Sequence, residues 1–416
     1  METLMSAQTN PEAQRYLDRA MDGLAFVLPL SIALSGILWG TALLLWVIVL
    51  WKNRPGYRWT GLEIPYLVCL GIAVLTSVTS AHPLHSLHAL RRESVVAVFL
   101  LASQTGSGST LRKRLVFFSL GATVAACFGL LQWAIGFDWN PTLGPAALPN
   151  AIRFIHPGVV HLFALHAGRA QGFYGHPITY AEMLLLAGAV MFGLWLVEHG
   201  RGWIAGCVAV GGAILVSQTR SVWLALFLLL GAWVVVRRDK RVLAIALILA
   251  ASFGLGLAVN PTLRGRAASI VDTKENESNL IRMGLWDKAV GLIRQHPVLG
   301  IGSGNFCVEG KDLRWGGAKP DSKWTETHNM YLQRAVGQGL VGFAAFLWFL
   351  GAIGQRLWKS AQSNPSTWGI FFGFLGLLAA GATETWTNDS EVVMCLYFLV
   401  GTAIAWSTTT EPPSLS

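Results

Sequence analysis

The chain has 416 residues and a formal net charge of +9; 13% of its residues are charged and 53% are hydrophobic. An ordinary globular domain has ~25% charged residues. So few charges cannot cover the surface of a water-soluble protein of this length, which excludes the soluble, fibrous, disordered and disulfide-scaffold classes. The composition therefore predicts a polytopic membrane protein.

Apolar stretches follow one another along most of the chain. They lie at 24–51, 61–79, 94–104, 115–137, 178–197, 202–217, 221–236, 242–259, 337–355, 366–382 and 391–407. A helix needs about 20 apolar residues to span a bilayer. The first stretch is too long for one span and predicts two short helices with a break near Pro29 or Ser35, whereas 94–104 must borrow flanking residues. We expect an all-α bundle of about twelve transmembrane helices.

The basic residues predict the orientation of this bundle. With the N-terminus in the cytoplasm, the inside connections carry thirteen Lys and Arg residues. The short outside connections carry five: Arg91, Arg92, Arg153, Arg169 and Arg220. Because Lys and Arg collect in cytoplasmic loops, this asymmetry favours cytoplasmic N- and C-termini.

Two long segments are expected on the outside, at 138–177 and 260–336. The second contains its own helix signal from Asn279, where apolar residues recur at helical spacing and His296 and Pro297 end the pattern. Its apolar face comprises Ile281, Leu285, Ala289, Leu292 and Ile293. The expected organisation is therefore nine helices in 1–259, a cap loop with an amphipathic helix in 260–336, and three helices in 337–416.

Three outside arginines are candidates for binding an anion. Arg220 is expected at the outer mouth of two helices, Arg169 precedes the next helix that enters the membrane, and Arg282 stands near the start of the cap helix, where the helix dipole disfavours a cation. Arginines that converge outside a membrane can bind a diphosphate. The alternative for each one is an interfacial arginine that reaches lipid headgroups.

His328 is the candidate general base. It is expected at the end of the cap, just before a helix enters the membrane, and a neutral imidazole there can take a proton from a sugar hydroxyl. The alternative is an interfacial histidine bonded to a backbone carbonyl. The acidic outside turn 383–389 could orient His328 or bind sugar hydroxyls, or it is simply a solvated turn. Glu182, a carboxylate just inside a predicted span, is a further candidate.

Two other patterns are weaker. The turn 300–304 is rich in glycine and could bring backbone N–H groups to a phosphate, but a tight turn after Pro297 explains it equally well. His82, His85 and His88 recur every third residue in an expected outside loop. They suggest a zinc site, although no Cys and no HExxH element supports one.

An ordered set of four motifs resembles the bacterial O-antigen ligase superfamily, which includes O-antigen polymerases and protein O-oligosaccharyltransferases. The motifs are Arg169 with Gly172, Phe173, Gly175, His176 and Pro177; Ser217 to Ser221; Arg282 with Trp286 and 297–302; and His328 with Asn329, Met330, Tyr331 and Leu332. Each motif is short, and the specificity comes from their order across residues 165–345.

The resemblance implies a GT-C-like fold in the bacterial inner membrane, with its active site facing the periplasm. It implies an inverting, metal-independent glycosyltransferase that moves polysaccharide from undecaprenyl diphosphate to lipid A–core, without a cofactor. His328 matches the essential histidine, Arg220 and Arg282 match the essential arginines, and Arg169 matches a less securely assigned position. Candidates for supporting roles are His176, Tyr331, Glu182, Asp389, Arg91 and Arg92.

Two alternatives use the same donor. An O-antigen polymerase or a protein O-oligosaccharyltransferase would share these motifs and differ in its acceptor. A transporter of lipid-linked glycans is the weaker alternative, because it predicts internal repeats and charges along a path through the bilayer midplane. The sequence has no visible repeat, and its unexplained charges are expected at the outer face.

Overall fold

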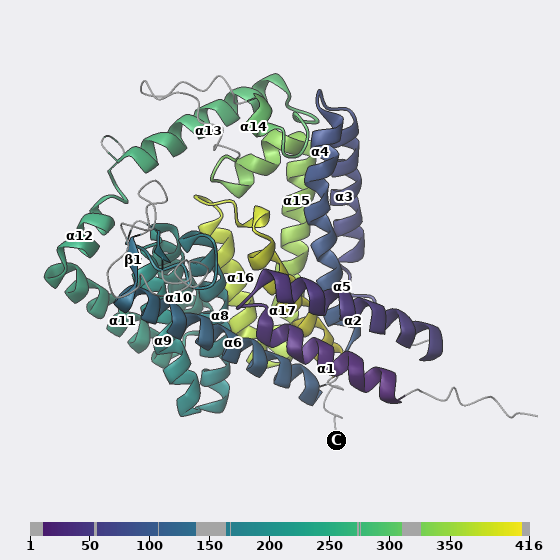
Figure 1. The fold of residues 1–416 in the computed structure, drawn as a ribbon, viewed down its shortest axis with the longest axis horizontal. Helices are drawn as coiled ribbons and strands as arrows, with labels where there is room; N and C mark the ends of the chain where they lie inside the picture. The colour runs from purple at the N-terminus through teal and green to yellow at the C-terminus, as the bar shows by residue number, and fades with distance from the viewer. Residues whose placement is uncertain are drawn as a thin grey trace, which may run out of the picture.

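A computed structural model of the protein describes residues 11–53, 56–106, 108–138, 164–166, 168–272, 274, 276–309 and 326–409. Most of the predicted outside loop 138–177 (residues 139–163 and 167) and residues 310–325 of the predicted cap lie outside this description. Within it the backbone is almost entirely α-helical (Figure 1). The two strands, β1 (Phe137–Asp138) and β2 (Ala164–Leu165), form a parallel pair of two residues each.

Six helices are long and apolar enough to cross a membrane. They are α2 (Ile32–Asn53), α6 (Gly108–Ile135), α8 (Pro177–Glu198), α10 (Arg220–Arg237), α11 (Lys240–Val259) and α15 (Met330–Ser363). Shorter apolar helices are α3 (Glu63–Val78), α9 (Arg201–Ser217), η4 (Pro365–Thr367) with α16 (Trp368–Ala380), and α17 (Ser390–Thr409). The protein is an all-α polytopic membrane protein, as its composition predicts.

The apolar stretch 24–51 differs from its prediction. It contains one membrane-length helix, α2, rather than two short ones. The break does fall beside Pro29, but the preceding helix α1 (Pro11–Val27) begins well before the stretch and is amphipathic. Its apolar face buries Leu17 and Met21, while Asp18 pairs with the fully buried Arg114 of α6 at 2.9 Å. The helix α1 can therefore include polar residues that precede the apolar stretch, because α6 supplies Arg114 as the ion-pair partner of Asp18.

The stretch 94–104 does borrow flanking residues. Three helical segments, α4 (Pro83–Ala89), η1 (Leu90–Val95) and α5 (Val96–Gln104), follow one another without a break. Pro83 begins the first of them, at a position where the missing N–H of proline has no cost. The expectation that His85 and His88 lie in a loop is therefore wrong, because both are helical and His82 is the residue that precedes the helix.

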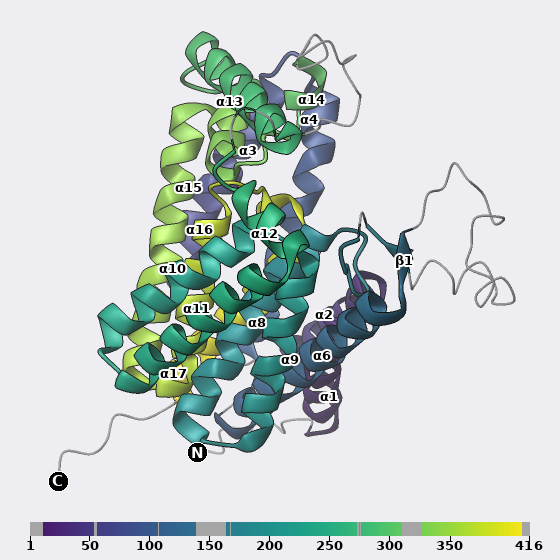
Figure 2. The same ribbon diagram turned by 90° about the vertical axis from the view of Figure 1, so that its left-hand side faces the viewer.

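The cap is built from α12 (Pro261–Ala268), α13 (Glu277–Gln295) and α14 (Phe306–Glu309). Figure 2 shows α13 and α14 beyond one end of the helix bundle, which we call the capped end. The predicted apolar face of α13 is confirmed: Leu285, Ala289 and Leu292 pack with Phe306 into a second hydrophobic core, separate from that of the bundle. The helix begins two residues earlier than expected, and Asn276 caps it through the Asn279 N–H.

A kink joins the cap to the bundle. α15 begins at Met330, seven residues before the predicted span, and bends at Gly339 with φ 65° and ψ −174°. Carbonyl groups in the first two turns of this helix accept hydrogen bonds from the glycine-rich segment 300–304. The Ile301 N–H donates to the Val336 carbonyl at 3.0 Å, and the Gly302 N–H donates to the Gly337 carbonyl at 2.9 Å. These amides serve packing, so the tight-turn interpretation of 300–304 is the one that fits the structure.

Candidate active site

A pocket of about 390 Å³ opens at the capped end of the bundle. Segments far apart in sequence form it: the approach to α8, the start of α10, helices α12 and α13, His328 just before α15, and the turn between α16 and α17. Arg169, His176, Arg220, Arg282 and His328 all line it. The structure therefore brings together all four residues that sequence analysis selected as catalytic or donor-binding.

Arg220 connects the bundle to the cap. As the first residue of α10 it is 7% exposed, and its guanidinium donates to Ser269 Oγ beyond α12 at 2.9 Å and to Asn279 Oδ1 of α13 at 3.0 Å. These acceptors are neutral. Within the described residues no carboxylate lies within 4 Å of this guanidinium, so its positive charge is not neutralised by the protein.

Arg169 and Arg266 lie on the same side of the pocket. Arg169 donates to the Ser217 carbonyl at 2.9 Å and to Thr219 Oγ1 at 3.0 Å, and Arg266 donates to the Gln218 carbonyl at 3.1 Å. Both therefore bind the turn between α9 and α10. Burial, and then the neighbouring Arg266, lower the pKa of Arg169 to about 10, which leaves it cationic at neutral pH. Sequence analysis missed Arg266, because no pattern distinguishes it from the other basic residues of the cap.

Glu384 joins Arg282 to His328. Its side chain is 4% exposed; one carboxylate oxygen is ion-paired with the Arg282 guanidinium and the other lies 3.4 Å from His328 Nδ1. Arg282 is the sixth residue of α13, so it does not stand at the helix start as expected. The sequence offered one signal for Glu384, its place in the acidic turn 383–389. The structure supports the reading in which this turn orients His328, since Glu384 is buried rather than solvated.

His328 is held in an uncommon conformation between two carboxylates. Its φ of +48° lies in the left-handed region, which non-glycine residues rarely adopt. Burial lowers the pKa of the ring, but Glu384, and also Glu326 at 3.8 Å, outweigh this effect, and the pKa lies above its ordinary value. A neutral ring with Nδ1–H toward Glu384 carries its basic lone pair on Nε2.

The pocket has an excess of positive charge. Four arginines line it against two carboxylates, Glu277 and Glu384. Only Arg282 of the four has an ion-pair partner among the residues that the structure describes. A partly buried site with uncompensated guanidinium groups favours an anion, and phosphate matches their geometry.

The remaining candidates divide between the pocket and its surroundings. His176 caps α8 by accepting from the Ile178 N–H, and burial lowers its pKa to about 4, so it is neutral at pH 7. Tyr331 donates to the Leu378 carbonyl at 2.8 Å and ties α15 to α16. Glu182 is fully buried within α8, and neither of its carboxylate oxygens has a hydrogen bond within the described part of the chain. Neither Tyr331 nor Glu182 lines this pocket.

Arg91, Arg92 and Asp389 line a second pocket, at the other side of the segment 326–328. Asp389 accepts from Thr179 Oγ1 at 2.8 Å, and burial is the main reason that its pKa is raised to about 7.

Two of the three histidines, His82 before α4 and His85 within it, contact different partners. His82 lies 3.6 Å from Glu309, and His85 Nδ1 lies 2.9 Å from Asn305 Oδ1. Across the described ranges, no group of three or more His, Cys, Asp and Glu side chains is arranged to hold a metal ion. The geometry gives no support to the zinc interpretation of His82, His85 and His88.

The fold and the pocket define a polytopic membrane protein with an arginine-lined site and a carboxylate-bound histidine at one end of its bundle. Residues 205–347, from α9 into α15, match the family model described as O-Antigen ligase. This match, which covers about a third of the chain, supports the resemblance of its motifs to the O-antigen ligase superfamily. Arg220, Arg282 and His328 lie inside the matched region, and Arg169 and Glu384 lie outside it. A comparison with curated proteins gives no match.

Proposed function

We propose that the protein is an O-antigen ligase, which transfers polysaccharide from undecaprenyl diphosphate to lipid A–core during lipopolysaccharide biosynthesis. The observation that carries this proposal is a pocket that is lined by four arginines and contains the Arg282–Glu384–His328 chain of contacts. It unites a site for a diphosphate with a base, and the family match supplies the substrate class.

The arginines stabilise the leaving group. As the bond between the anomeric carbon and the diphosphate breaks, negative charge grows on the bridging oxygen. Arg220, Arg169 and Arg266 already face neutral acceptors in the protein, so their charge is available to that oxygen and to the other phosphate oxygens. Cationic groups fixed in place before the reaction stabilise such charge without the cost of reorganisation. In this proposal they take the part that a metal ion plays in other transferases.

His328 activates the acceptor. Nε2 takes the proton of an acceptor hydroxyl while the hydroxyl oxygen attacks the anomeric carbon, and undecaprenyl diphosphate leaves from the opposite face. One displacement of this kind inverts the anomeric configuration. Glu384 fixes the ring and stabilises the imidazolium that forms, and Arg282 holds Glu384 in place.

The placement in the membrane follows the charge asymmetry. Arg112, Arg201 and Arg237 stand at the ends of α6, α9 and α10 opposite to the pocket. We propose that this end faces the cytoplasm of the bacterial inner membrane, together with both termini, and that the pocket faces the periplasm.

Reconstitution tests the proposal. Purified protein in liposomes receives the lipid-linked donor, a chelator, and either lipid A–core or a second lipid-linked repeat as acceptor. We expect transfer to lipid A–core that the chelator leaves unchanged. Elongation of the lipid-linked repeat alone would identify a polymerase, transfer to a protein would identify an oligosaccharyltransferase, and no transfer with donor translocation would favour a transporter.

Two substitutions separate the proposed roles. His328→Ala should reduce transfer by a factor of about 10² or more and leave donor affinity intact, because it removes only the base. Arg220→Ala should weaken donor binding as well as turnover. Equilibrium binding of the donor, measured beside the transfer rate, checks both; normal transfer by the first variant would contradict the base assignment.

A further inference from the structure

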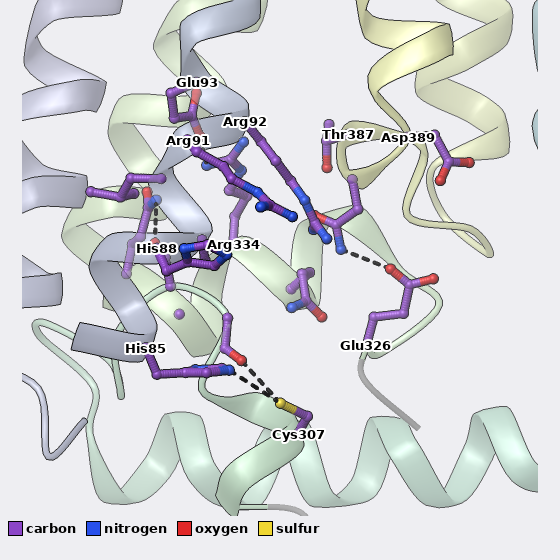
Figure 3. A pocket seen from close by; sticks show the side chains of 18 residues that line it. His85, His88, Arg91, Arg92, Glu93, Cys307, Glu326, Arg334, Thr387 and Asp389 are labelled. Atoms are coloured by element: carbon purple, nitrogen blue, oxygen red, sulfur yellow. Dashed lines mark hydrogen bonds and ion pairs between the residues drawn. The ribbon is translucent and has the colours of Figure 1, made fainter. Parts of the chain in front are cut away.

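A second pocket, of about 420 Å³, lies at the capped end (Figure 3). It is formed by α4, η1, the start of α15, the turn residues 303 and 304, α14 and the η5 segment (Trp386–Asn388). The two pockets share the short segments that hold the proposed base. Glu326 lines the second pocket, whereas His328 lines the first. Likewise, Asp389 lines the second pocket and Glu384 lines the first. The segment 326–328 therefore separates them.

This second pocket is lined by both arginines and carboxylates. Figure 3 shows Arg91 and Arg92 extending from η1 into the pocket. The imidazoles of His85 and His88 come from α4, the helix that directly precedes η1. Arg334 is ion-paired with Glu93 at 3.0 Å. Arg91 and Arg92 have no ion-pair partner within 4 Å in the described part of the chain. Glu326 lies 3.8 Å from Nδ1 of the proposed base His328, and burial raises the pKa of both Glu326 and Asp389.

Two further cavities, linked to this pocket by shared lining residues, lie along the bundle. The smaller cavity lies next to the pocket and shares Arg92, Glu93 and Arg334 with it. That cavity in turn shares Phe349, Ile353 and Tyr397 with a crevice of about 220 Å³. The crevice lies between α3, α5, α15 and α17, and its lining is almost entirely apolar, including Leu67, Val96 and Phe99. The three cavities thus change from a polar pocket through a mixed neck to an apolar crevice. This order matches the two ends of an amphipathic molecule.

We infer that the second pocket is the acceptor subsite and that it selects a glycolipid with an anionic, phosphate-bearing saccharide. Arg91 and Arg92 bind the anionic groups, the crevice holds an acyl chain, and the acceptor hydroxyl reaches His328 past Glu326. This inference rests on the proposed function. An inverting displacement needs the nucleophile and the leaving group on opposite faces of the sugar, and two pockets on the two sides of 326–328 provide that arrangement.

The charge requirement is tested by binding in the absence of donor. Wild-type protein in phosphatidylcholine nanodiscs is titrated with lipid A–core that carries phosphate on its saccharide, and with the same glycolipid after removal of those phosphates. The double variant Arg91→Gln, Arg92→Gln should bind the phosphorylated form roughly tenfold or more weakly, because it loses charge-assisted hydrogen bonds to the phosphate. It should bind the dephosphorylated form as the wild type does.

The matched control is the double variant Arg264→Gln, Arg294→Gln. It removes the same charge from exposed positions of the cap that line neither pocket, and it should bind like the wild type. Equal binding of both glycolipid forms by the wild type would overturn the inference. So would an equal loss in the control, or competition by phosphatidylglycerol as strong as that by the glycolipid, which would indicate a general site for anionic lipids.

The apolar crevice is tested with the same probes. De-O-acylated lipid A–core should bind the wild type more weakly than the acylated form. Val96→Trp, which fills the crevice, should weaken binding of the acylated form and leave the other unchanged; unchanged binding of both forms in both proteins would overturn this part. Since no donor is present, a failure here is distinct from a failure of the proposed function, which would appear as absent transfer by a protein that binds its acceptor normally.

Discussion

At the scale of single residues, Glu384 organises the candidate active site. Its two carboxylate oxygens contact Arg282 on one side and His328 on the other, so a single buried acid positions both a cation and the proposed base. Burial of an ionised carboxylate without such partners is costly, and the removal of one partner here would leave an uncompensated charge. Glu384 is therefore a positioning residue whose effect passes through His328 and Arg282.

Glu384 should also set the pH dependence of transfer. Burial lowers the pKa of His328, but Glu384 raises it above its ordinary value, so the wild-type ring keeps its proton to a higher pH and becomes a base only above that pKa. The rate should rise with pH through this range. In Glu384→Gln the raising effect is lost, so the acidic limb of kcat/KM should move to lower pH while the maximal rate falls. A pH–rate profile of both proteins checks this.

Glu309→Gln provides the control for that experiment. Glu309 is an acid of the cap that lies beside His82 and does not line the donor pocket. Its profile should coincide with that of the wild type. An acidic limb that stays in place in Glu384→Gln would show that His328 is not the titrating base.

At the scale of secondary-structure elements, α15 decides how the cap meets the bundle. Sequence periodicity predicts the limits of α13 within two residues, because its apolar face and the following His296 and Pro297 are local signals. It places the start of α15 seven residues late, since the first two turns pack on the turn 300–304 instead of on lipid. No local sequence pattern predicts that the carbonyl groups of a helix will accept hydrogen bonds from the amides of a distant turn.

The kink of α15 should require a glycine at position 339. Its φ and ψ lie in a region almost exclusive to glycine, and a Cβ there would stand 2.1 Å from the Val298 carbonyl oxygen. We expect Gly339→Ala to destabilise the protein by roughly 1–3 kcal/mol or more and to lower its melting temperature. In the same helix Gly351 has nothing within 4 Å of its Cβ position, so Gly351→Ala should leave the melting temperature unchanged or raise it. Equal thermal stability of the two variants would contradict the packing argument.

At the scale of the whole molecule, the distribution of charge separates two ends. Basic residues such as Arg201 and Arg237 lie at one end, and the arginines that line the two pockets lie at the other. The long apolar helices between these ends are exposed on their outer faces, as in α11, where only Val242 is buried. The bundle thus has the organisation of a protein that crosses the bilayer with a polar, cap-covered face.

This orientation makes a labelling prediction. Gly265 in the cap and Gly202 at the opposite end are both exposed with open space around them, so each tolerates a cysteine. In a background without the five native cysteines, Gly265→Cys should react with a membrane-impermeant maleimide in spheroplasts, and Gly202→Cys only after permeabilisation. The reverse pattern would place the pocket in the cytoplasm and exclude a periplasmic ligase.

The sequence by itself determined the class of protein, most of the helices and the amphipathic face of α13. It also selected the candidate site residues Arg169, Arg220, Arg282 and His328. These follow from local properties: apolar runs, helical spacing, and arginines that topology leaves unexplained. Only the tertiary structure decided that the four residues share one pocket, that Glu384 and Arg266 complete it, and that a second pocket adjoins it. The reason is physical: which distant side chains meet depends on how helices pack and where α15 bends, and those contacts leave no periodic trace in the chain.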